Sequence, residues 1–97
     1  MDKADIPIVL VTRVRALPGA RLALHFSDGM AGVFDCAPLF ASTGAMIQPL
    51  RDPSFFAQVF LEMGAPTWPN GYDLDPMNLY MRLREAGALA QGAVAAE

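Results

Sequence analysis

The 97-residue sequence has few of the residue types that catalytic and metal sites need. It contains one cysteine, Cys36, and one histidine, His25. A single cysteine cannot form an internal disulfide, and one Cys with one His cannot build a zinc site. The glycines at positions 19, 29, 32, 44, 64 and 71 are dispersed across predicted turns and form no phosphate-binding loop. These absences exclude disulfide scaffolds, zinc sites and the common nucleotide-binding motifs.

Long apolar runs and an excess of positive charge are also missing. The longest apolar run, Ile6–Val11, contains Pro7 and is far shorter than the roughly 18 residues that cross a bilayer. Met1–Asp5 lacks the basic start and apolar stretch of a secretory signal. Seven basic and ten acidic residues give a net charge of −3, which does not favour nucleic-acid binding. We expect a cytoplasmic protein with no membrane association and no direct nucleic-acid binding.

What the sequence does contain is apolar residues, at 54% of the chain. Ninety-seven residues can bury one modest core, so this share indicates either a rich core or apolar surface meant for a partner. The composition predicts a flexible N-terminus over residues 1–7 and a single domain over residues 8–85. Residues 86–97 are rich in alanine and are predicted to form a disordered tail unless a partner orders them.

Residues 8–35 predict a three-stranded antiparallel meander. The first strand, residues 8–17, is rich in β-branched residues, and its alternation puts Val11, Arg13 and Arg15 on one side. Leu17-Pro18-Gly19-Ala20 is typical of a type II turn. Asp28-Gly29 is typical of a two-residue type I′ hairpin. With that loop His25 faces Gly32, and the faces of the sheet follow: Leu22, Leu24, Phe26, Ala31 and Val33 buried, with His25, Gly32 and Phe34 outside.

The second half predicts short helices and a small hairpin. Asp52-Pro53 and Asp75-Pro76 are helix starts, because the carboxylate can accept from free backbone N–H groups and proline fits the first helical position. One helix should run from Pro53 to about Ala57, and another from Pro76 past Leu83. Residues 59–62 and 66–68 form a second, smaller hairpin. The predicted fold class is therefore α+β: a meander, short helices, a small second hairpin and a C-terminal helix.

The stretch Trp68–Pro76 concentrates the strongest local signals. Pro69, Asn70 and Gly71 predict a sharp turn directly after Trp68. Trp68 carries a large apolar area and one N–H that needs a partner. It either anchors the core under this turn or stacks on a ligand.

A catalytic interpretation finds little support. Cys36 falls opposite Arg21 in the predicted register, four residues from His25, or about 13 Å at roughly 3.3 Å per residue, which excludes a Cys-His pair. Cys36 is therefore interpreted as a small buried hydrophobe. Asp73 and Asp75 beside Asn70 offer too few oxygen donors for calcium. We expect no enzyme activity, no cofactor and no metal.

Surface residues offer the remaining candidates. Arg13, Arg15 and Arg21 form a basic strip that either meets an acidic partner or RNA, or is merely solvated. Phe34, predicted on the outer face with His25, implies either a covering helix or an interface.

Several blocks of the sequence resemble a known family. They are Phe26–Gly29, Leu50–Pro53, Phe56–Val59 and above all Trp68–Pro76 with Leu79-Tyr80. Over about residues 8–84 the chain resembles the domain of unknown function 2442 family of small bacterial proteins. The resemblance implies a compact α+β domain and a non-enzymatic accessory or antitoxin-like role beside a small toxin-like protein. Some relatives add a helix-turn-helix, whereas this chain has only an alanine-rich stretch after Leu83.

The leading hypothesis is a binding module that docks a protein partner through its sheet face or the Trp68 to Asp73 edge. The alternative is a self-associating, homodimeric structural domain. A small-ligand function would need a pocket beside Trp68 and Tyr72. The candidate partner-binding residues are Trp68, Asn70, Tyr72, Asp73, Phe34 and His25.

Overall fold

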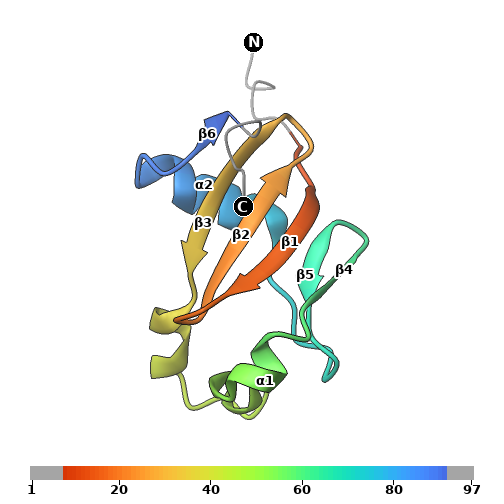
Figure 1. Ribbon diagram of the computed structural model, residues 1–97, viewed down its shortest axis with the longest axis vertical. Helices are drawn as coiled ribbons and strands as arrows, with labels where there is room; N and C mark the ends of the chain where they lie inside the picture. Colours follow the sequence, from red (N-terminus) through yellow and green to blue (C-terminus); the bar gives the residue numbers. More distant parts are fainter. Residues whose placement is uncertain (1–7, 92–97) are drawn as a thin grey trace.

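A computed structural model describes residues 8–91; the predicted N-terminal segment 1–7 and the last part of the predicted tail, 92–97, lie outside the described residues. One antiparallel sheet has the order β1-β2-β3-β6, and a separate hairpin pairs β4 with β5 (Figure 1). The fold class is α+β, as predicted. The strands are β1 Val11–Leu17, β2 Arg21–Phe26, β3 Met30–Asp35, β4 Phe60–Glu62, β5 Ala65–Thr67 and β6 Ala90–Gln91. The helices are two 3-10 turns, η2 Ala37–Ala41 and η3 Gln48–Arg51, and the α-helices α1 Pro53–Phe56 and α2 Pro76–Glu85.

The β2–β3 turn has three residues where two were predicted. The Gly29 N–H donates to the Phe26 carbonyl at 3.0 Å, the Met30 N–H donates to the Asp28 carboxylate at 3.0 Å, and Gly29 has φ +93°. This geometry matches a type I turn followed by a left-handed glycine. The partners become His25 with Ala31 and Leu22 with Phe34. The predicted register is therefore wrong by one residue.

The shift moves β3 side chains to the other face of the sheet. Phe34 lies on the face that carries Leu22, and is half-buried, whereas Val33 lies on the outer face with 44% of its surface exposed. The predictions that Phe34 and Gly32 share the outer face with His25, and that Val33 is buried, are wrong. Ala31 is buried as predicted, but it lies opposite His25 on the outer face.

A second irregularity corrects β1. Val11 pairs with Phe26 and Arg13 pairs with His25, so the ladder shifts at Thr12. Such a bulge changes which face the following residues occupy. Val11 is consequently buried while Arg13 and Arg15 are exposed, and the prediction that all three share one side is wrong.

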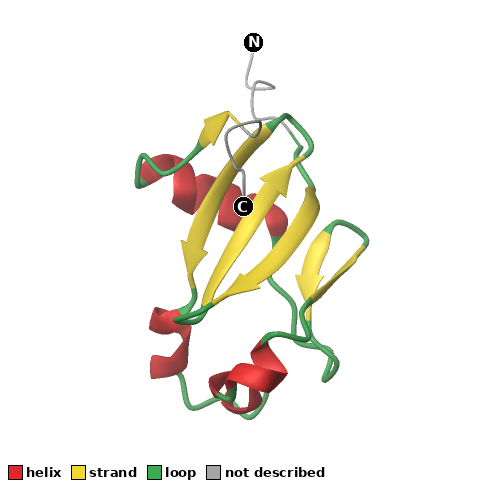
Figure 2. Cartoon of the chain, viewed as in Figure 1, coloured by secondary structure: helices red, strands yellow, loops and turns green. Residues whose placement is uncertain are grey.

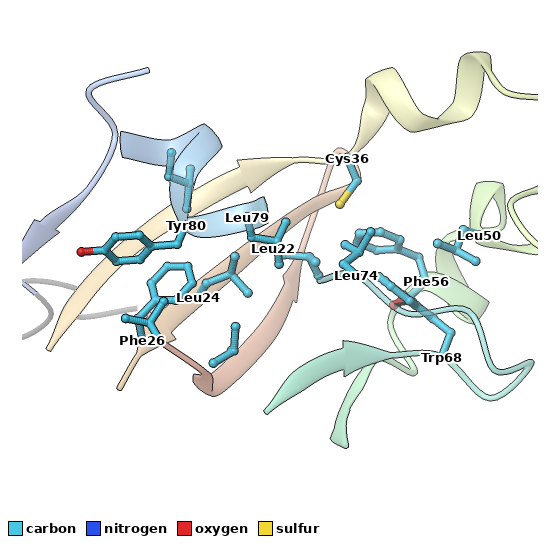
Figure 3. Packing of buried hydrophobic residues seen from close by; sticks show 13 residues of the cluster. Leu22, Leu24, Phe26, Cys36, Leu50, Phe56, Trp68, Leu74, Leu79 and Tyr80 are labelled. Carbon is cyan, nitrogen blue, oxygen red and sulfur yellow. Dashed lines mark hydrogen bonds between the residues drawn. The ribbon is translucent and has the colours of Figure 1, made fainter. Parts of the chain in front are cut away.

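Helix α2 covers one face of the sheet and leaves the other face toward the viewer (Figure 2). The buried residues run in a row from Phe26 and Tyr80 at one end to Leu50 and Trp68 at the other (Figure 3). Leu22 and Leu24 supply the sheet side of this row, and Leu79 supplies part of the helix side. The single core therefore extends from the β2–β3 hairpin to the end of the β4–β5 hairpin.

The helix ends follow local rules with one exception. Asp52 caps α1 by accepting from the Ser54 N–H at 3.1 Å, as predicted. Asp75 occupies the same position before α2, but its side chain makes no capping bond, so that part of the prediction is wrong. Beyond α2, Gly87 has φ +69° and the Ala88 N–H donates to the Leu83 carbonyl at 2.8 Å, which is a Schellman ending.

The chain continues from α2 back to the sheet. Ala90 pairs with Ala31 and Gln91 pairs with Met30. The first residues of the predicted tail, 86–91, thus form a turn and an edge strand. Residues 92–97 of that tail lie outside the described part of the chain.

Candidate functional site

Trp68 is a core residue with 0% of its surface exposed. Its indole N–H donates to the Phe56 carbonyl at 2.9 Å, and its ring lies 5.6 Å from Phe56 and 6.0 Å from Tyr72 between centroids. The structure supports the core-anchor interpretation, since no surface of Trp68 is available to a ligand or partner.

The turn after Trp68 is tied to the rest of the chain. The Gly71 N–H donates to the Trp68 carbonyl at 2.8 Å, and the Trp68 N–H donates to the Tyr72 carbonyl at 2.9 Å. The Asn70 side chain accepts from the Tyr72 N–H at 3.1 Å and donates to the Met46 carbonyl at 3.0 Å. One end of the Asn70 amide therefore closes the turn, and the other ties the turn to the segment at Met46.

Tyr72 and Asp73 retain some surface at this edge. Tyr72 is half-buried, and its pKa is raised first by burial and then by the nearby Cys36 and Asp73. Asp73 is exposed, and its backbone forms a bridge with Thr67. The edge predicted to dock a partner therefore offers Tyr72 and Asp73 together with the exposed Asn70.

The outer face of the sheet gathers the basic residues. Arg13 lies opposite His25, and Arg15 lies opposite Ala23, around a shallow hollow of about 110 Å³. Arg21 continues this face toward the β1–β2 turn, where its Nε donates to the Pro18 carbonyl at 2.9 Å. The predicted basic strip exists as a geometric feature.

Phe34 lies away from His25, in a groove that the sequence did not predict. The groove has a volume of about 520 Å³ and runs between β3, η2 and the C-terminal end of α2. Leu39 and Leu83 contribute apolar surface, and Arg82 and Glu85 contribute both charges. Its lining residues are Val33, Phe34, Asp35, Pro38, Leu39, Arg82, Leu83, Glu85, Ala86 and Ala88.

The groove lies along an open stretch of the sheet edge. β6 pairs only with Met30 and Ala31, so within residues 8–91 no strand pairs with the outer side of β3 from Gly32 to Asp35. An unpaired strand edge presents backbone N–H and C=O groups that another chain can bind. The structure thus brings an apolar groove and free backbone groups together at Phe34.

Cys36 is not a nucleophile in this arrangement. It has 0% of its surface exposed, and burial, helped by the charge of Asp35, raises its pKa to about 12. The thiolate is the reactive form, so a thiol with this pKa is inert at neutral pH. This agrees with the prediction of a small buried hydrophobe.

Tyr80 and Asp28 form a long-range contact that local sequence signals do not reveal. The Tyr80 hydroxyl donates to the Asp28 carboxylate at 2.5 Å, and this bond is the main cause of the raised pKa of Tyr80. The Tyr80 ring also packs edge-on against Phe26, with centroids 5.0 Å apart. Helix α2 thereby holds the β2–β3 turn in its three-residue form.

Sequence reasoning found Phe34 but missed its neighbours. Leu39, Arg82 and Glu85 come from separate elements, and no spacing signal connects them with β3. Val33 was assigned to the core because of the register error. Only Phe34 carried a usable signal, namely an aromatic at a position where cover or an interface was expected.

A family comparison now supplies the wider setting. The family described as protein of unknown function (DUF2442) matches residues 11–85, from β1 to the end of α2. The chain belongs to this family. The match includes the Trp68 turn and most of the groove at Phe34. No curated protein matches the chain, and no solved structure matches it.

The function of the DUF2442 family is unknown, so membership in it does not assign an activity to this chain. In residues 8–91, no three His, Cys, Asp or Glu side chains gather as a metal site. No helix in the same range is long and apolar enough to span a membrane. The groove contains the candidate residue Phe34, and the hollow of the basic strip contains the candidate residue His25.

Proposed function

We propose that this protein is a non-enzymatic binding module that takes an extended segment of a partner protein along the open edge of β3. The observation that carries the proposal is the coincidence of unpaired β3 backbone with the groove at Phe34. In this recognition mode main-chain hydrogen bonds give affinity, and pockets for alternate side chains give specificity.

The chemistry of the groove indicates the kind of segment. Phe34, Leu39 and Leu83 offer an apolar floor, which suits a partner side chain of similar character. Arg82 and Glu85 on α2 and Asp35 on β3 suit polar residues flanking that side chain. The bound segment is therefore an extended strand with one or two apolar residues between polar ones.

We also propose an antitoxin-like role, which the family resemblance implies. In that role the partner is a small toxin-like protein, and the β3 edge inhibits it by taking one of its segments. The proposal places both proteins in the cytoplasm, a compartment that suits a lone reduced thiol.

The test compares two substitutions at sites of matched exposure. Val33, at 44% exposed, lines the groove, and Met46, at 45% exposed, does not. Tagged wild type, Val33→Glu and Met46→Glu are expressed at native level, and co-purifying proteins are quantified by mass spectrometry. We expect a stoichiometric partner with wild type and Met46→Glu, and its loss with Val33→Glu.

A partner retained equally by all three proteins would contradict the groove as its site. Circular dichroism of the two variants serves as the folding control. A wild-type protein that recovers no stoichiometric partner would contradict the binding-module proposal as a whole.

A homodimer is the second candidate, and a separate apolar surface favours it. Met63 is 91% exposed and Ile8 is 87% exposed, while Leu10 and Phe60 are each exposed by more than two fifths. Leu10 lies against Gly64 at the tip of the β4–β5 hairpin, so these residues extend one surface at that hairpin. If the protein is dimeric, the Met63→Glu variant should be monomeric by light scattering. The Val33→Glu variant should remain dimeric.

A further inference from the structure

A second hollow lies between the β1–β2 turn and α1, apart from the groove at Phe34. Its volume is about 450 Å³, which falls in the range of roughly 300–1,000 Å³ that small-ligand sites occupy. The turn Leu17–Ala20 forms one wall, Phe40 and Leu50 form another, and Phe56 with Ala57 closes the end. These walls are mainly apolar.

Arg51 is the only ionisable side chain among the residues that line this hollow. Its Nη2 donates to the Phe40 carbonyl and, at 3.5 Å, to the Ser42 carbonyl. The guanidinium carbon lies 5.9 Å from the centre of the Phe40 ring. These contacts hold the cation at the rim of an apolar space.

The charge of Arg51 has no carboxylate partner among residues 8–91. The neighbouring acid, Asp52, directs Oδ1 to the Ser54 N–H and hydroxyl. A guanidinium has five N–H donors, and both bonds that Arg51 makes use Nη2. The N–H groups of Nε and Nη1 therefore remain for a ligand.

We propose that this hollow binds a small apolar carboxylic acid, with its hydrocarbon body against Phe40, Leu50 and Phe56 and its carboxylate on Arg51. A paired Arg–carboxylate contact is both stronger and more directional than a neutral hydrogen bond. The apolar walls hold the body and the single cation selects the head group. The site is independent of the groove at Phe34, so either can fail without the other.

The experiment titrates the full chain with phenylpropionate and octanoate, and with phenylpropionamide as the uncharged match, followed by amide-resolved NMR. We expect saturable shifts of the amides of Gly19 and Ala20 and of the non-proline residues in 51–57. Hydrogen bonds to charged groups are stronger than hydrogen bonds between neutral groups. Phenylpropionamide should therefore bind at least about tenfold more weakly than phenylpropionate. Trp68 fluorescence should change in parallel, since its ring touches Phe56.

Two variants and one control locate the site. Arg51→Gln should weaken binding of the two acids about tenfold and leave binding of the amide unchanged. Ala57→Leu, which puts a larger apolar side chain into the hollow and keeps the cation, should weaken binding of both the acids and the amide. Arg13→Gln removes an arginine of the outer sheet face and should change neither.

Other results would overturn the proposal. Equal binding of acid and amide would remove Arg51 as the recognition group. Shifts outside the hollow, or no saturable shift in wild type, would remove the site itself. Shifts at residues 51–57 only when a partner protein is added would make the occupant a protein side chain instead of a small acid.

Discussion

At the scale of single residues, buried polar atoms that reach a specific partner define the Trp68 end of the core. The Trp68 indole N–H crosses to the Phe56 carbonyl, which joins the long turn before α2 to the end of α1. A buried acceptor that loses its donor costs stability even when the volume change is small. Trp68 therefore anchors two segments of the core and does not contact a binding partner.

Trp68→Phe tests this assignment. Losing the N–H and part of the ring should lower the free energy of unfolding by about 2–4 kcal/mol, from the unsatisfied carbonyl and the cavity together. Urea unfolding followed by circular dichroism measures the change. Asp73→Asn at the exposed edge is the control and should stay within about 0.5 kcal/mol. A Trp68→Phe protein as stable as wild type would contradict the anchoring role.

Cys36 supplies a pH-dependent prediction at the same scale. The pKa of Cys36 is raised from 9.0 to about 12 in the folded protein. The contribution of the neutral thiol to folding stability is therefore complete below pH 9 and is lost as the pH rises toward about 12. A shift of this size corresponds to at most about 4 kcal/mol. Urea midpoints of Cys36→Ala should therefore fall less steeply over this alkaline range than those of wild type. Parallel curves for the two proteins would contradict a raised pKa of Cys36 in the folded protein.

At the scale of elements, the sequence signals that are local were the ones that worked. Asp52-Pro53 and Pro76 mark the starts of α1 and α2, and the Pro18-Gly19 turn reverses the chain, because each depends on backbone preferences of adjacent residues. The β2–β3 register could not be obtained this way. Asp28-Gly29 suits two- and three-residue loops alike, and the bond from Tyr80, distant in sequence, favours the longer one.

The candidate site was less predictable than the fold for the same reason. The groove at Phe34 needs β3, η2 and α2 in their final positions, and the hollow at Arg51 needs the β1–β2 turn against η3 and α1. Neither combination leaves a spacing pattern in the sequence. Phe34 was a candidate from the sequence and it lines the groove, but its predicted face was wrong because the register was wrong.

Two glycines of the β2–β3 region give a matched test of element packing. A Cβ on Gly32 would meet the Ala88 carbonyl oxygen at 2.9 Å, whereas a Cβ on Gly29 would meet nothing within 4 Å. Gly32→Ala should displace the segment after α2 and lower stability by about 1–3 kcal/mol. Gly29→Ala should lose only about 1–2 kcal/mol, through its positive φ.

Hydrogen exchange separates the two causes. Faster exchange over residues 86–91 is expected in Gly32→Ala alone, because only that variant pushes the segment off β3. Equal exchange of this segment in both variants would contradict the close packing of Ala88 on β3.

At the scale of the whole molecule, the structure separates its surfaces by character. The outer sheet face carries the basic strip, the open β3 edge adjoins the groove at Phe34, and the β4–β5 hairpin carries exposed apolar residues. Within residues 8–91 many apolar residues are buried in one core, while large ones such as Val33 and Met63 are exposed. This distribution supports the proposal that the domain acts by binding a partner.

The most direct test of the central proposal is hydrogen exchange of the wild-type protein alone and with the partner that Met46→Glu retains and Val33→Glu loses. An added strand would bind the outward N–H groups of β3, which alternate along the strand. The account predicts that alternate amides within Val33–Asp35 become protected, while amides of β1 and of the β4–β5 hairpin do not change. Protection confined to the outer sheet face around Arg13 or to the hairpin around Met63, with the β3 edge unchanged, would contradict it.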